Sequence, residues 1–157
     1  MATPRDIRRL AFQVLYQIDA RGADDPHALA EGAHESDNMT PKERDKAVRL
    51  ALDAYNDRSR ADAAMATLAP TWPAHRQAAV DRAILRLAHY EMTVAGTPPK
   101  IVVNEAVELA KAFSTEKSPT FINGLLDRIM KSLAVGSGAG CAEPDTADAS
   151  DDVPPPS

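Results

Sequence analysis

The stretch S118-PTFINGLLDR-I129 decides between two folds for the C-terminal half of the chain. Its Asn123-Gly124 pair between apolar residues is a strong short-range signal for a β-hairpin. The apolar residues around this pair, at 122, 125, 126, 129 and 133, instead follow the period of one helix face. The sequence therefore predicts a helix here. A glycine inside a helix costs about 1 kcal/mol relative to alanine, so we interpret Gly124 as a notch that lets another helix approach closely.

The same period extends upstream and predicts an all-α fold with about seven helices and no strand. Two signals mark helix ends: Thr40 and Glu43 form a capping box around Pro41, and Gly96 precedes two prolines that no helix can continue through. The expected helices cover about 5–20, a short segment from Asp25-Pro26, 41–55, 58–68, 74–95, 100–113 and a last one from Ser118.

The length of 157 residues and a hydrophobic content of 44% suit one globular domain. We predict one all-α domain over residues 1–133, made of two small helical subdomains with a boundary near the prolines at 70–73. Residues 134–157 are rich in Gly, Ala, Ser, Asp and Pro. Such a segment buries too little apolar surface to offset its ordering entropy, so it is predicted to be a disordered acidic tail.

The net charge of −5 is unevenly distributed along the chain. All 18 Lys and Arg residues lie at or before Lys131, whereas five of the 23 acidic residues lie beyond it. The predicted domain is thus neutral, and the tail carries the whole acidic excess. A neutral domain can still present a local basic face, so a nucleic-acid partner is not excluded.

Several classes of function are disfavoured by what the sequence contains. We expect no membrane helix and no signal peptide, and the single cysteine, Cys141, fits a reducing cytoplasm. The four histidines show no metal-ligand spacing, and Glu105 with Glu108 lacks the ExxH partners of a di-metal site. No Ser or Cys has a nucleophile signature. The chain is therefore predicted not to be an enzyme and to need no cofactor or metal.

The first helix has a second face opposite its apolar stripe. This face collects three guanidinium groups and two aromatic rings, from Arg5, Arg8, Arg9, Phe12 and Tyr16. Guanidinium groups pair with phosphates and aromatic rings stack on unpaired bases, so the combination suits single-stranded RNA. The alternative is that the two rings pack on a neighbouring subdomain and the arginines are only solvated.

Three strings carry a family resemblance that covers nearly the whole predicted domain: RRLAFQVLYQ (8–17), VDRAILRLAHYEM (80–92) and PPKIVVNEAVELAKAFSTEKSPTFINGLLDRI (98–129). In order and spacing they resemble the bacterial NusB family of transcription antitermination factors. The resemblance implies two packed helical subdomains and no catalysis. It also implies binding to boxA RNA of ribosomal RNA leaders, pairing with NusE, a small-subunit ribosomal protein, and entry into an RNA polymerase antitermination complex.

The resemblance also assigns residues. The arginine-rich N-terminus of the family falls on Arg5, Arg8 and Arg9, its RNA-contacting tyrosine on Tyr16, and its RNA-facing phenylalanine on Phe121. Its NusE-facing surface resembles the segment of Asp81 and Arg82. The arm has only three arginines here, interrupted by Asp6, which implies weaker RNA binding alone and greater dependence on the partner.

Two other classes of function remain open from the sequence. A similar domain stands at the N-terminus of certain RNA cytosine methyltransferases, but that reading needs a cofactor-binding α/β domain after the helices. Some family members self-associate, and a neutral domain offers little charge repulsion against a structural homodimer.

Overall fold

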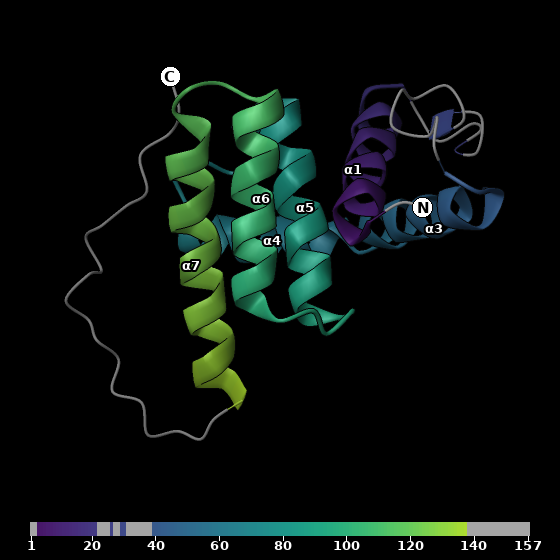
Figure 1. The fold of residues 1–157 in the computed structure, drawn as a ribbon. Helices are drawn as coiled ribbons and strands as arrows, with labels where there is room; N and C mark the ends of the chain where they lie inside the picture. The colour runs from purple at the N-terminus through teal and green to yellow at the C-terminus, as the bar shows by residue number, and fades with distance from the viewer. Residues whose placement is uncertain (1–2, 22–25, 27–28, 31–38, 138–157) are drawn as a thin grey trace.

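The computed structural model describes residues 3–21, 26, 29–30 and 39–137. Within these residues the chain forms six α-helices and one 3-10 turn, and no strand, so the all-α prediction is confirmed (Figure 1). The elements are α1 (Pro4–Arg21), α3 (Pro41–Asn56), α4 (Arg58–Leu68), η2 (Ala74–Arg76), α5 (Ala79–Thr93), α6 (Pro99–Phe113) and α7 (Ser118–Ser137). The short helix expected from Asp25-Pro26 falls mostly outside the described residues, as does the tail from 138.

The predicted capping box at the start of α3 is confirmed. The Thr40 hydroxyl accepts from the Glu43 amide at 3.1 Å, and the Glu43 carboxylate accepts from the Thr40 amide at 2.9 Å. A second reciprocal pair opens α1, where Thr3 and Asp6 exchange the same two bonds at 3.1 and 3.0 Å. Its hydrogen bonds with Thr3 lower the pKa of Asp6. Asp6, which in the sequence interrupts the basic arm, therefore helps to cap α1.

The ends of α5 and α7 can be compared with the predicted bounds. Helix α5 begins at Ala79 and not at 74, because residues 74–76 form a separate 3-10 turn in which the Arg76 amide bonds the Pro73 carbonyl. It ends at Thr93, two residues before the expected limit at 95, and Gly96 takes a φ of +76°, the left-handed conformation that glycine adopts most readily. Helix α7 continues to Ser137, beyond the predicted limit of the domain at 133.

Helix α5 lies at the centre of the fold. It contacts α1, α3, α4, α6 and α7, while α1 packs on α3 and α6 packs on α7 (Figure 1). Ten of its residues are buried, including the charged Asp81, Arg86 and Glu91. This arrangement confirms that a helix with only a narrow polar stripe is covered by neighbours on several sides.

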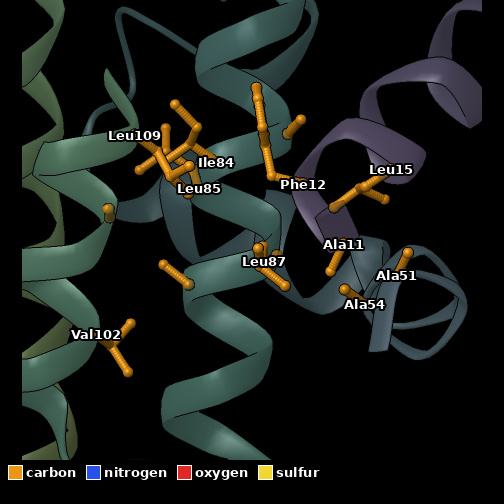
Figure 2. Packing of buried hydrophobic residues seen from close by; sticks show 14 of the residues in the cluster. Ala11, Phe12, Leu15, Ala51, Ala54, Ile84, Leu85, Leu87, Val102 and Leu109 are labelled. Atoms are coloured by element: carbon orange, nitrogen blue, oxygen red, sulfur yellow. The ribbon is translucent and has the colours of Figure 1, made fainter. Parts of the chain in front are cut away.

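The core contains small side chains where α1 meets α3 and a larger one, Phe12, on the side of α1 toward α5. Ala11 of α1 and Ala51 and Ala54 of α3 are buried together where these helices meet, and short side chains allow the two axes to lie close (Figure 2). The Phe12 side chain extends from α1 toward α5 (Figure 2). A single cluster of buried apolar side chains thus joins α1 and α3 to the helices around α5.

A network of charged groups ties α1 and α4 to the central helix. Arg86 of α5 is 8% exposed and donates to both carboxylate oxygens of Asp62, at 3.0 and 2.8 Å. It also pairs with Asp19 of α1 at 3.2 Å. Burial alone would lower the pKa of Arg86, but the two carboxylates raise it above its ordinary value. The guanidinium is therefore charged and has a carboxylate partner on each of two other helices.

Candidate nucleic-acid interface

The first guanidinium of α1 is held at the surface by a carboxylate of α6. Arg5 donates from Nε and Nη2 to the two oxygens of Glu105, at 2.9 and 2.8 Å, while its side chain remains 54% exposed. This hydrogen-bonded pair raises the pKa of Arg5 and lowers that of Glu105. Both groups are therefore charged at neutral pH, and Glu105 occupies the bidentate position that a phosphate would take.

The second guanidinium, that of Arg8, forms an ion pair inside the protein. Arg8 donates from Nε to Glu91 at 2.9 and 3.0 Å, and its Nη2 lies 2.8 Å from the same carboxylate. Glu91 is buried in α5, and the Arg8 side chain is only 13% exposed. The pair joins α1 to α5, so Arg8 is less available to a ligand than the sequence predicted.

The third guanidinium lies on an aromatic ring that the sequence analysis did not select. Arg9 stands 5.5 Å from the ring centroid of Phe113, the last residue of α6. In the described part of the chain it makes no ion pair. The sequence places Phe113 at the end of the helix expected over 100–113 and contains no signal that its ring packs against α1.

The prediction that Phe12 lies on an exposed face is wrong. Its side chain is 3% exposed, with its ring 5.2 Å from Phe113 and 6.4 Å from Tyr16 between centroids. The alternative from the sequence holds for this ring, because α6 covers it. Tyr16 is half-buried at the edge of the ring cluster. What remains accessible on α1 and α6 is a smaller surface, which we call the α1–α6 face: Arg5, Arg9, Tyr16 and Phe113.

Phe121 also requires correction. Its side chain is 2% exposed, among the largest buried groups of the core, so its ring offers no face to a base. Phe121 lies on the same side of α7 as Ile122 and Leu125, which pack inside the protein. In this structure it supports the fold of α7 and does not belong to the accessible surface.

Asp81, predicted to contact a partner, is buried and accepts hydrogen bonds from other residues of the same chain. Its carboxylate is 1% exposed and accepts from the Ser114 hydroxyl at 2.6 Å and from the Ser118 hydroxyl at 3.0 Å. Ser114 ends α6 and Ser118 begins α7. Asp81 therefore holds the α6–α7 turn against α5 through the two serine hydroxyls.

Arg82, the second residue predicted to contact a partner, also has an internal role. Its Nη2 and Nε donate to Asp19 of α1, at 2.6 and 3.1 Å, and its Nη1 donates to the Gln77 carbonyl at 3.3 Å. Its side chain is largely covered. Arg82 joins α1 to α5, as Arg86 does one turn later.

Two further observations bear on the kind of site. Among the described residues no group of three His, Cys, Asp or Glu side chains could hold a metal ion. None of the helices described is long and apolar enough to cross a membrane.

Comparison with known proteins gives one consistent family. The family model described as the NusB family matches residues 5–131. The transcription antitermination protein NusB of Symbiobacterium thermophilum is 38% identical over 143 residues, covering 86% of this chain and 94% of its own. That of Streptomyces griseus is 40% identical over 131 residues, covering 82% and 92%.

Solved structures agree with the sequence relatives. A structure of Thermotoga maritima NusB superposes with a TM-score of 0.71 at 34% identity, covering 83% of this chain and 93% of the other. A complex described as antitermination factors NusB and NusE with dsRNA gives a TM-score of 0.70 at 28% identity, covering 82% and 96%. These relatives are antitermination factors and not enzymes, which confirms the non-enzymatic prediction. On the extent of these matches, the chain belongs to the NusB family, whose relatives here are RNA-binding transcription antitermination factors.

Proposed function

We propose that this protein binds single-stranded boxA-type RNA jointly with NusE and joins the RNA polymerase antitermination complex in the cytoplasm, supporting ribosomal RNA transcription. The observation that carries the proposal is the α1–α6 face. There two guanidinium groups and two aromatic rings from separate helices meet on one surface. A solved structure described as NusB and NusE in complex with dsRNA supports a joint RNA-binding role with NusE.

Each part of the α1–α6 face has a separate task in this proposal. Arg5 and Arg9 neutralise phosphates of the strand, and Tyr16 stacks on one unpaired base. Phe113 supports the Arg9 guanidinium by a cation–π contact and keeps it at the surface. Arg8 fixes the angle between α1 and α5 through Glu91, so that the other groups converge.

The face is small, which has a consequence for affinity. Phe12, Phe121 and most of Arg8 are withdrawn from it. Arg5 is already engaged by Glu105. We therefore expect weak binding to RNA by this protein alone and tighter binding once NusE adds its own surface to the same strand.

Fluorescence anisotropy with a labelled boxA-type RNA tests the proposal directly. The protein is titrated alone and then with NusE, at two salt concentrations, against a scrambled RNA of the same length. Selective binding that tightens with NusE and weakens with salt is expected, because salt competes with phosphate contacts. Equal affinity for the two RNAs in both titrations would refute the proposal, and a concentration-dependent homodimer would then be the next function to test.

Replacing Glu105 by Gln is expected to tighten RNA binding, by up to about fivefold, the upper range for an exposed ion pair. The substitution removes the charge that competes with phosphate for Arg5. Glu108→Gln is the matched control for the loss of a nearby negative charge, because Glu108 lies one turn away in the same hollow but pairs with Lys111. Anisotropy at low salt measures both variants. Weaker binding by the Glu105 variant would mean that this carboxylate positions Arg5 for RNA and does not compete.

A further inference from the structure

A groove runs along the side of α1 that faces away from α6. It has a volume of about 880 Å³ and lies between the first turns of α1, the first half of α3 and the turn after α5. Pro4, Ile7 and Arg8 line it from α1, and Lys42, Lys46 and Arg49 line it from α3. The groove lies outside the α1–α6 face, and the internal Arg8–Glu91 pair forms part of its wall.

The three cations of α3 share one side of the helix. Their spacing of four and three residues places them within a narrow sector, about 6 Å and then about 4.5 Å apart along the axis. In the described part of the chain none of the three forms an ion pair, unlike Arg8 and Arg86 of the core. A line of cations about 10 Å long is enough to follow more than one phosphate of a strand.

Three carboxylates also line the groove, and each has an interaction of its own. Glu91 is paired with Arg8, and Glu43 accepts the Thr40 amide in the capping box of α3. Asp45, the third carboxylate there, also has an interaction of its own. With Arg8 and Glu91 paired, Lys42, Lys46 and Arg49 outnumber the carboxylates of Glu43 and Asp45, and these three cations share one side of α3, so the groove favours an anionic strand.

The groove is continuous with the α1–α6 face through the first turns of α1. Arg8 lines this groove and also the shallow hollow formed with Arg5 and Arg9 on the other side of the helix. A strand that crosses the N-terminus of α1 would pass from the guanidinium groups of the α1–α6 face to the three cations of α3. In the first turn of α1, Thr3 and Pro4 are small, Arg5 is a cation, and the Asp6 carboxylate accepts from the Thr3 amide.

We propose that this groove is a second RNA site, which takes the phosphate backbone of the strand where it leaves the α1–α6 face. Lys42, Lys46 and Arg49 contact phosphates and read no base, so the site adds affinity without sequence preference. The inference rests on the proposed function. It extends the bound length of RNA from α1 onto α3, a helix to which the sequence analysis gave no role in binding.

The test uses the full chain and RNAs of two lengths. The short probe is a labelled boxA-type strand of about 12 nucleotides, within the range of single-strand site sizes. The long probes carry about eight added uridines at the 5′ or the 3′ end, so that a strand leaving in either direction can reach the groove. The groove variant is Lys42→Gln/Lys46→Gln/Arg49→Gln. The control variant, Arg60→Gln/Arg76→Gln/Lys131→Gln, loses three positive charges from exposed positions that do not line the groove.

The groove variant is expected to bind one of the long probes about tenfold more weakly than the unmodified protein does. Its affinity for the short probe should stay within about twofold. The slope of log affinity against log salt for that long probe should fall by about 2, since each single-strand phosphate contributes about 0.7. Thermal melting monitored by circular dichroism verifies that both variants remain folded.

Two results would overturn the inference. One is equal loss of affinity for short and long probes in the groove and control variants, which would indicate only long-range charge. The other is unchanged binding of both long probes by the groove variant. This result would mean that the groove does not bind RNA, and an acidic protein segment would then be its candidate ligand. In either case selective binding of the short probe by the unmodified protein would leave the proposed function intact, whereas its absence would refute that function separately.

Discussion

Replacing Arg86 by Met is expected to lower the free energy of unfolding by about 3 kcal/mol, near the lower end of the range for breaking a buried ion pair. Arg86 is 8% exposed and holds Asp62 of α4 and Asp19 of α1. Its removal leaves the Asp62 carboxylate, which is partly covered, without its bidentate partner. Urea unfolding followed by circular dichroism measures the change, with the m-value as a check that the variant still unfolds in one step.

Arg60→Met is the matched control for this experiment. Arg60 also pairs with an aspartate, Asp57 at 3.0 Å, but its side chain is 58% exposed and the two residues lie three apart on the chain. An exposed pair of this kind contributes about 0–1 kcal/mol. Similar losses for the two variants would mean that burial does not strengthen the Arg86 network, contrary to our account of how α1 and α4 are held to α5.

Replacing Tyr16 by Ala is expected to weaken binding of boxA-type RNA by about 5- to 150-fold, which corresponds to the 1–3 kcal/mol of one base stack. Tyr16 is the half-buried ring at the edge of the α1–α6 face, whereas Phe12 beside it is covered. Fluorescence anisotropy measures the affinity. Tyr16→Phe keeps the ring and loses only the hydroxyl, so it should bind almost as the unmodified protein does.

Tyr55→Ala separates stacking from a general effect of losing a tyrosine. Tyr55 is a half-buried ring on α3 with the Arg58 guanidinium 3.8 Å from its centroid, and it does not belong to the α1–α6 face. Its variant should lose stability but keep its RNA affinity. Normal RNA binding by Tyr16→Ala, or equal losses for the two alanine variants, would remove Tyr16 from the proposed site.

The amino-acid sequence by itself determined the secondary structure closely. Apolar residues at helical spacing and a few end signals are local features, so the helix in S118-PTFINGLLDR-I129, the capping box at Thr40 and the stop at Gly96 were all predicted from neighbours within four residues. The strings that resemble NusB likewise identified the family, because they are long and keep their order.

Which side chains are accessible was decided only by the tertiary structure. The helical period placed Phe12 opposite the apolar stripe of α1. In the folded chain, however, α6 lies on that side of α1, and its Phe113 ring packs against Phe12. Asp81 looked like a surface charge until α6 and α7 placed two serine hydroxyls on it. A helical wheel describes one helix in isolation, whereas exposure depends on contacts between residues far apart in the sequence. The partners of Arg5 and Arg8, which lie 100 and 83 residues away, could for that reason be found only in the folded chain.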